Sequence, residues 1–143
     1  MPYEYLDGIA LADVAFRARG KTLEEVFGAA VDATTGTMVE NLNEVDASLR
    51  KRVRLSDDSL DMLLYQLLQE IVFYKDAERL LLRARTFSFG ENGGTHILDA
   101  LLAGERIDAG KHRLVVDVKA VTLHRLSLRE TGDGWEATVV LDV

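Results

Sequence analysis

The chain has no cysteine and a single proline among its 143 residues. Without cysteine there are no disulfide bonds, thiolate metal ligands or cysteine nucleophile, as is usual in a reducing compartment. The proline, Pro2, lies outside every segment that we expect to be regular. No apolar run reaches the ~18 residues that a membrane-spanning helix needs. The sequence therefore predicts a domain stabilised by its hydrophobic core, with no membrane span.

Basic residues are in the minority. There are 17 Lys and Arg against 24 Asp and Glu, giving a formal net charge of -7. This balance argues against broad, sequence-independent nucleic-acid binding, which requires a basic surface. It fits a cation site, a basic partner, or simply a soluble acidic surface. The first residues, MPYEYLDG, have neither a basic segment nor an apolar signal core, so we expect a cytoplasmic protein.

Motifs of known enzyme classes are also lacking. The sequence has no nucleophile elbow, no phosphate-binding loop and no His-x-x-x-His pair. We therefore expect a protein that is not an enzyme. A metal-dependent hydrolase that uses strand carboxylates is the catalytic alternative.

The apolar pattern predicts one α+β domain over residues 1–143, with a mostly antiparallel sheet and two main helices. A strand over 9–18 precedes a helix that starts at the capping box of Thr22 and Glu25; we expect this helix to fray over 34–37. Leucines at helical spacing predict the longest helix, over 59–77. Strands are predicted over 80–89, 96–107, 113–130 and 135–143, the last two segments meeting at the TGDG turn.

A basic stripe lies in the predicted strand LRKRVRL, residues 49–55. Arg50, Arg52 and Arg54 share one face of that strand because side chains alternate between its two faces. Such stripes commonly form a solvated face or protect an edge strand from unwanted pairing. A partner-binding role is the alternative.

Two acids in strands are the candidate metal ligands. Asp13 interrupts the apolar first strand, and Asp142 stands one residue before Val143, the last residue of the sequence. Carboxylates and main-chain oxygens of neighbouring strands could hold a hard cation, although the sequence does not show that these strands touch. The alternatives are that Asp13 pairs with an arginine and that Asp142 is a solvated terminal residue.

The segment GKHRLVVDVKAVTLHR holds further polar candidates. Strand alternation predicts that Asp117 and Lys119 form a surface pair. By the same alternation His124 becomes a half-buried structural residue, whereas His112 is expected to be exposed in a loop.

The whole sequence resembles the archease family. The similarity rests on YEYLD and ADVAFRARGKTLEEVF, then on LDMLLYQLLQEIVF, GERIDAGKH, VKAVTLH and the final GDGWEATVVLDV, in family order. Many archeases have His-Thr-Ala-Asp where this chain has Ala10-Leu11-Ala12-Asp13, so the acid is retained and the histidine is absent.

The resemblance implies a function. Archeases assist the tRNA-splicing RNA ligase by promoting the ligase–guanylate intermediate, and they were earlier proposed as chaperones of a tRNA methyltransferase. They bind a divalent cation, calcium, through residues that correspond to Asp13, Asp142 and the backbone or terminal oxygens of Val143. Lys119 and His124 match the family stretch that could form a functional patch. We thus expect protein partners, no direct nucleic-acid binding and no membrane.

Overall fold

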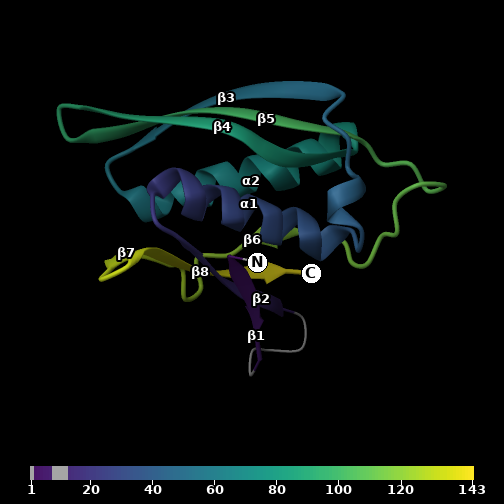
Figure 1. Cartoon of the computed structure of the whole chain (residues 1–143), viewed down its shortest axis with the longest axis horizontal. Coiled ribbons are helices and arrows are strands. Elements are labelled where there is room, and N and C mark those ends of the chain that lie inside the picture. Colours follow the sequence, from purple (N-terminus) through teal and green to yellow (C-terminus); the bar gives the residue numbers. More distant parts are fainter. Residues whose placement is uncertain (1, 8–12) are drawn as a thin grey trace.

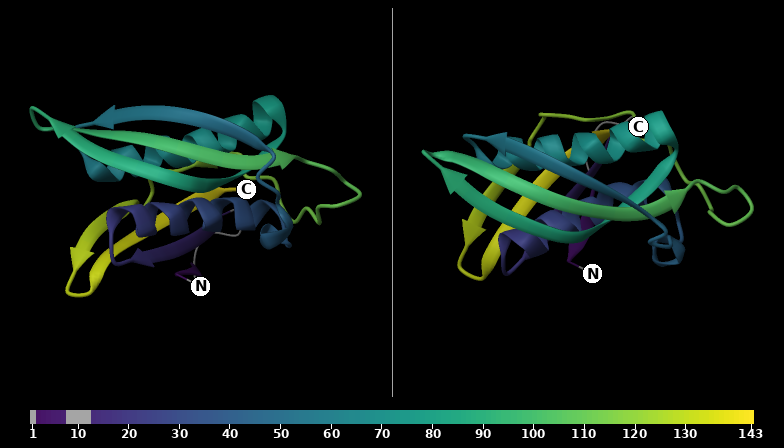
Figure 2. Two further views of the ribbon diagram at one scale, coloured as in Figure 1. Left: turned by 45° about the horizontal axis from the view of Figure 1, so that its top comes forward. Right: turned by 90° about the horizontal axis from the view of Figure 1, so that it is seen from above.

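The computed structural model describes residues 2–7 and 13–143. Two α-helices lie between two antiparallel β-sheets, so the chain forms three layers (Figure 1). Seen from above, the three-stranded sheet crosses over the two helices (Figure 2, right). This arrangement confirms the predicted α+β class and adds that the strands divide into two sheets.

One sheet has five strands in the order β1-β2-β8-β6, with β7 pairing with another part of β8. These strands are β1 (Tyr3–Leu6), β2 (Asp13–Gly20), β6 (Ala120–Val121), β7 (Ser127–Thr131) and β8 (Gly134–Asp142). The second sheet has the order β3-β5-β4. Its strands are β3 (Leu49–Asp57), β4 (Leu80–Asn92) and β5 (Thr95–Arg106). The first and last long strands of the chain are therefore neighbours in the five-stranded sheet.

The two helices are α1 (Leu23–Met38) and α2 (Leu60–Glu78), and a short 3₁₀ helix, η1 (Leu42–Glu44), follows α1. The Thr22 hydroxyl accepts a hydrogen bond from the Glu25 amide at 3.1 Å, which confirms the predicted helix cap. Helix α2 ends at Arg79, which adopts the left-handed conformation that commonly stops a helix.

The hydrophobic core fills the space on both sides of the helical layer. Phe27 of α1 and Leu64, Leu67 and Leu68 of α2 are fully buried. The inner faces of both sheets pack against these helical residues. Leu102 of β5 is an example from the three-stranded sheet. Because one helical layer supports both sheets, neither sheet has a core of its own.

The end of α1 is ordered, contrary to the predicted fraying over 34–37. Thr34 and Thr35 are fully buried. Their hydroxyls donate to carbonyl oxygens, that of Thr34 to Ala30 at 2.9 Å and that of Thr35 to Leu82 at 2.6 Å. Side-chain hydrogen bonds and burial outweigh the low helix propensity of threonine here.

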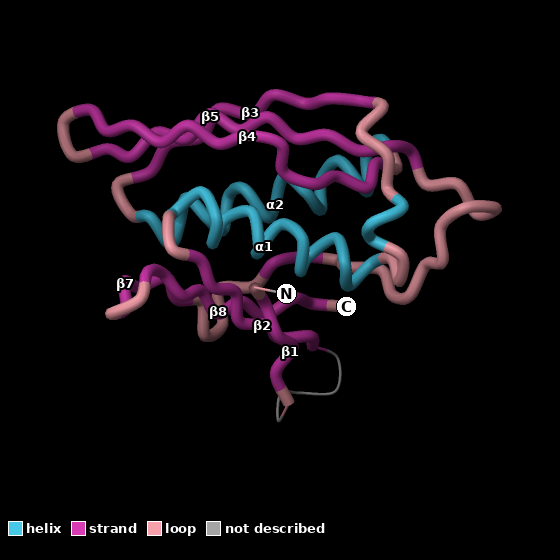
Figure 3. The backbone as a smooth tube through the Cα atoms, in the orientation of Figure 1, coloured by secondary structure: helices cyan, strands magenta, loops and turns pink. Residues whose placement is uncertain are grey.

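The segment 113–130 differs most from its prediction. Only β6 and β7 are strands, and residues 115–119 form an extended connection without regular pairing. Figure 3 shows the long loop that leads from β5 into this connection. Lys75 of α2 fixes it by donating to the Asp117 carboxylate and to the Val118 carbonyl oxygen, the latter at 2.7 Å. The predicted Asp117–Lys119 surface pair is therefore replaced by a contact between a helix and this connection.

Candidate metal centre and its surroundings

Asp13 and Asp142 are direct cross-strand partners. Strands β2 and β8 pair antiparallel, and the register places Asp13 opposite Asp142. Side chains at such positions share one face of the sheet, with Cβ atoms about 4.5–5.5 Å apart. The second strand of the described chain and its last strand thus bring together the two acids singled out in the sequence. The preceding residues 9–12 of the predicted first strand lie outside the described residues.

The pairing places two carboxylates of like charge opposite each other. Like charges directly opposite each other destabilise a pair of strands. Both acids are half-buried, and within the described residues neither carboxylate takes part in a salt bridge. The expected alternative of an Asp13–arginine pair is therefore not seen. A bound cation or a shared proton would relieve the repulsion.

The neighbours of Asp142 fix its main chain. Val143 is half-buried and packs against the core, which fixes the main chain beside Asp142. On the other side Ala120 pairs with Asp142, and the Lys119 amide donates to the Asp142 carbonyl oxygen at 2.8 Å. The main chain at Asp142 is thus held from both sides, by β2 and by β6.

The donor set suits a hard cation in part. Over residues 2–7 and 13–143, no three His, Cys, Asp or Glu side chains lie together as a metal site. Asp13 and Asp142 offer carboxylate oxygens, and Val143 offers main-chain oxygens. Since Ca²⁺ takes about 6–8 oxygen ligands, these residues would supply only part of a calcium shell and would leave the remaining positions to water or a partner molecule.

The two other residues of the predicted patch have different positions. Lys119 is exposed and adjoins Asp142 through the main chain. His124 is exposed in a turn, so the expectation of a half-buried structural histidine is wrong. The reason is that residues 122–126 turn back between β6 and β7 and do not continue a strand.

His112 is buried, contrary to the expected exposed position. Its Nδ1 accepts a hydrogen bond from the Asp108 amide at 2.9 Å, which fixes the loop after β5. Its Nε2 lies 3.6 Å from a Glu105 carboxylate oxygen. The contacts of His112 stabilise this loop, and nothing in the local sequence distinguishes it from an ordinary loop histidine.

An apolar hollow of about 390 Å³ adjoins Asp13. Tyr5, Val115 and Val116 line it, and their side chains are among the most exposed large apolar groups of the described chain. The Tyr5 hydroxyl donates to the Ala33 carbonyl oxygen at 3.1 Å, and burial raises the pKa of this hydroxyl. The acid pair therefore borders a surface with the composition of a protein-binding patch.

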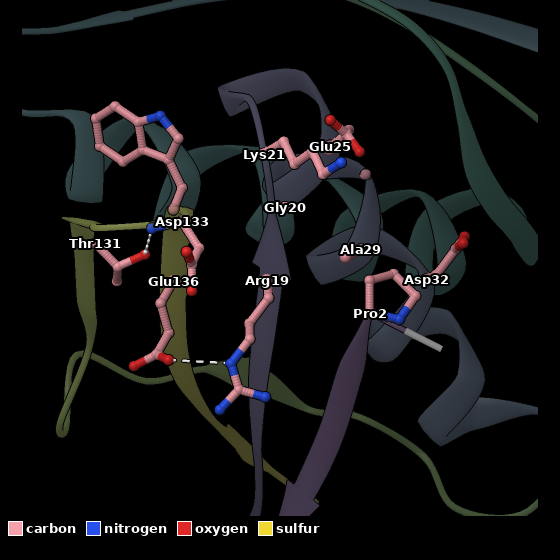
Figure 4. A pocket seen from close by; sticks show the side chains of 12 residues that line it. Pro2, Arg19, Gly20, Lys21, Glu25, Ala29, Asp32, Thr131, Asp133 and Glu136 are labelled. Carbon is pink, nitrogen blue, oxygen red and sulfur yellow. Dashed lines mark hydrogen bonds and ion pairs between the residues drawn. The ribbon is translucent and has the colours of Figure 1, made fainter.

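Another hollow, of about 650 Å³, lies at the other end of β2. Arg19, Lys21 and Trp135 line it together with acids, and Arg19 pairs with Glu136 at 3.1 Å (Figure 4). Gly20 lies seven positions after Asp13, about 23 Å along a strand. This hollow and the candidate metal centre are thus separate features of the same strand pair.

Comparison with known proteins identifies the family of the chain. Residues 3–143 match the Archease protein family. The chain belongs to the archease family. An archease of Methanosarcina barkeri is 32% identical over 142 residues, covering 99% of this chain and 95% of the relative. An archease of Pyrococcus furiosus is 31% identical, covering 92% and 93% of the two chains.

Solved structures agree with this archease assignment. The solution structure of Methanobacterium thermoautotrophicum protein 1598 is 31% identical and covers 99% of each chain, with a TM-score of 0.85. A Thermotoga maritima protein, described as an archease and possible chaperone, has a TM-score of 0.65 at 17% identity and shows the shared fold. It matches 94% of this chain and 93% of its own. In the described part of the chain, no helix is long and apolar enough to cross a membrane.

Proposed function

We propose that this archease is an accessory protein of a tRNA-splicing RNA ligase and promotes formation of the ligase–guanylate intermediate. The observation that carries the proposal is the direct cross-strand pairing of Asp13 with Asp142. These are the two acids to which the family resemblance assigns a divalent cation, calcium. A calcium ion at this place supplies a positive charge that can be shared with an oxygen ligand of a partner.

The chain's own residues would hold and present the cation. Asp13 and Asp142 would each contribute a carboxylate, and Val143 a main-chain or terminal oxygen. Packing of Val143 and the hydrogen bond from Lys119 to Asp142 keep these groups in place. Because only a few ligands come from this chain, the remaining coordination positions stay available to the partner.

The surroundings of the acid pair support a protein partner. Val115 and Val116 are 58% and 39% exposed and border Asp13. An exposed apolar patch beside charged groups is typical of an interaction surface. The ligase would cover these residues when its active site approaches the acid pair.

The test is single-turnover guanylylation of the cognate ligase with wild-type protein, Asp13→Asn or Asp142→Asn. We expect the wild type to accelerate guanylylation and both variants to lose most of the acceleration. Asp99→Asn is the matched control, because Asp99 is an exposed strand acid on the other sheet. Equal rates with all four proteins, or no rate above that of the ligase alone, would reject the proposal.

A second function is favoured by the same apolar patch. The protein would then be a chaperone-like module for an RNA-modifying enzyme such as a tRNA methyltransferase, and the acids would matter less than Val115 and Val116. Co-purification from the native cell separates the two functions. Recovery of the ligase supports the first, and recovery of a methyltransferase without the ligase supports the second.

A further inference from the structure

The face of the five-stranded sheet turned away from the helices carries more than the acid pair. Ala15 and Val140 are 1% exposed but lie outside the core formed with the helices, as expected of residues on the opposite face. Alternate cross-strand pairs share this face. In order along β2 they are Asp13 with Asp142, Ala15 with Val140, Arg17 with Thr138, and Arg19 with Glu136.

A small hollow of about 220 Å³ lies in the middle of this face. Ala15 and Val140 contribute apolar surface to it. Its polar lining consists of two arginines and two hydroxyl residues from three different segments: Arg17, Arg125, Ser127 and Thr138. Convergence of guanidinium and hydroxyl groups on an enclosed space is the usual composition of an anion site.

Several polar groups that line the hollow have donors or acceptors without a hydrogen-bond partner in the described structure. The buried Nε of Arg17 makes no hydrogen bond, and its closest acid oxygen, on Glu136, is 3.7 Å away. Among the described residues, Arg125 forms no salt bridge, and the hydroxyls of Ser127 and Thr138 form no hydrogen bond to another side chain. A buried N–H group without a partner is costly, so a ligand oxygen at this position would be favourable.

The charged side chains that line the hollow itself are both arginines, although the chain as a whole is acidic. Glu4 and Glu136 are shared among three arginines of the sheet, with closest contacts of 2.9–3.7 Å. Those arginines are Arg17, Arg19 and Arg129. Arg125 adds a fourth positive charge at the hollow itself. Four guanidinium groups face two carboxylates in this stretch, and the next two carboxylates, those of Asp13 and Asp142, lie one cross-strand step beyond the hollow.

Arg125 is held over the hollow by an unusual backbone. Its φ of 57° places it in the left-handed region, which costs a residue with a Cβ roughly 1 kcal/mol or more. The turn that contains it is anchored because Thr122 donates through both its amide and its hydroxyl to the Val140 carbonyl oxygen, each at 3.0 Å. The Arg125 side chain is therefore attached at a fixed point beside β8.

We propose that this hollow binds the phosphate group of a phosphate ester. Arginine suits this ligand because its planar fork can donate two parallel hydrogen bonds to phosphate oxygens. Two sources share the chemistry, a free nucleotide and the terminal phosphate of an RNA. The hollow begins one cross-strand step from Asp13 and Asp142, about 7 Å along the strands. This proposal goes beyond the role of the acid pair and stands without a bound cation.

The test follows amide chemical shifts by NMR during titration with inorganic phosphate at constant ionic strength. We expect saturable shifts at Arg125, Ser127 and Thr138. In Arg125→Asn, affinity should fall about tenfold, the loss expected for one charge-assisted contact, and asparagine tolerates the left-handed backbone. Arg50→Asn, on the other sheet, is the matched control and should bind phosphate as the wild type does. Ser127→Ala serves as a second variant with a smaller loss.

Two further titrations distinguish the sources. Guanosine 5′-monophosphate is compared with guanosine, and a short RNA with a 3′-phosphate is compared with the same RNA ending in a hydroxyl. Preference for the phosphorylated member of either pair supports the site and identifies its source. Absence of saturable shifts, equal affinity in Arg125→Asn, or no preference in both pairs would overturn the proposal. Calcium binding of the Asp13→Asn variant is measured separately, so failure of the cation site and of the phosphate site remain distinguishable.

Discussion

The two sheets pack on the same pair of helices but carry different chemistry on their outer faces. The five-stranded sheet brings together Asp13 and Asp142 from distant parts of the chain, with unpaired charge and half-buried positions. The three-stranded sheet displays Arg50 and Arg52, exposed residues of a single strand at its edge. Long-range strand pairing places two like-charged carboxylates opposite each other, whereas a basic stripe on one edge strand can remain fully solvated.

The first prediction concerns the helical layer that both sheets share. Leu67→Ala removes a fully buried side chain of α2 and should lower the free energy of unfolding by about 2–5 kcal/mol. Because neither sheet has a separate core, both should unfold in the same transition. Chemical denaturation followed by Trp135 fluorescence, which reports the five-stranded sheet, and by circular dichroism should give coincident curves. Separate transitions would show that the sheets are independent units.

The second prediction tests the unpaired charge. Calcium should stabilise the wild type by about 2.7 kcal/mol at a concentration of about 100 times Kd. Without calcium, Asp142→Asn should be as stable as the wild type or more stable by up to about 1 kcal/mol, because it removes the repulsion. With calcium the order should reverse. Thermal unfolding with calcium and with a chelator measures both effects, and an unchanged melting temperature in all conditions would contradict a cation site.

The third prediction concerns Lys75, whose side chain is 7% exposed. Burial lowers its pKa, but hydrogen bonds to Asp117 and Asp76 outweigh that effect, so the pKa is raised. Lys75→Met should cost about 1–3 kcal/mol, because the Val118 carbonyl oxygen loses its buried donor. Since the folded-state pKa is raised, this stabilisation is complete at neutral pH and disappears only as the pH rises through that pKa.

The exposed Lys119 provides the control for Lys75. Lys119→Met should change the free energy of unfolding by no more than about 0.5 kcal/mol. Calcium affinity should fall in Lys75→Met as well, since the connection fixed by Lys75 continues directly into the pairing with Asp142. Urea denaturation at neutral pH and at high pH, with a calcium titration of each variant, checks these expectations. Equal stability of the two variants would contradict the role of Lys75.

The connection held by Lys75 also shows where sequence reasoning was insufficient. The helices and most strands follow from local periodicity, as the leucines of α2 illustrate. Residues 115–119 alternate as a strand would, yet in the described structure they form no regular ladder, because only their two ends bond to neighbouring main chain, at Met38 and Asp142. Between those ends the connection is held by a lysine about 40 positions away in the chain. Asp13 and Asp142 stood out in the sequence as acids within strands, but periodicity cannot show that they are neighbours, and only the family resemblance joined them with Val143 as one ligand set.

The fourth prediction uses Glu136, which lies among Arg129, Arg19 and Arg17. The hydrogen bond from Arg129, together with that from Arg19, holds the pKa of Glu136 below its ordinary value despite burial. Its contribution to stability is therefore present above the unfolded-state pKa and is lost as the pH falls through the folded-state pKa. Glu136→Gln should cost about 1 kcal/mol or less at neutral pH, since its arginine partners are largely exposed.

The acid range provides the check on Glu136. At a pH below both pKa values, wild type and Glu136→Gln should be equally stable, and the difference between them should grow as the pH rises. Glu130→Gln is the control, because Glu130 is exposed and forms no salt bridge within the described chain. Denaturant unfolding at a series of pH values gives the comparison. A difference independent of pH would show that the charge of Glu136 is not the cause.

The smallest effect on stability is expected at the basic stripe. Arg50→Gln and Arg52→Gln together should change the free energy of unfolding by no more than about 0.5 kcal/mol, because both side chains are exposed and form no salt bridge among the described residues. Strand β3 is an edge of its sheet, and charged residues on an edge strand oppose pairing with other chains. If the stripe prevents such pairing, the double variant should self-associate in sedimentation velocity. Its acceleration of ligase guanylylation should then stay at the wild-type level. If the stripe binds a partner, the variant should remain monomeric and lose that acceleration, and the outer faces of both sheets would then be functional.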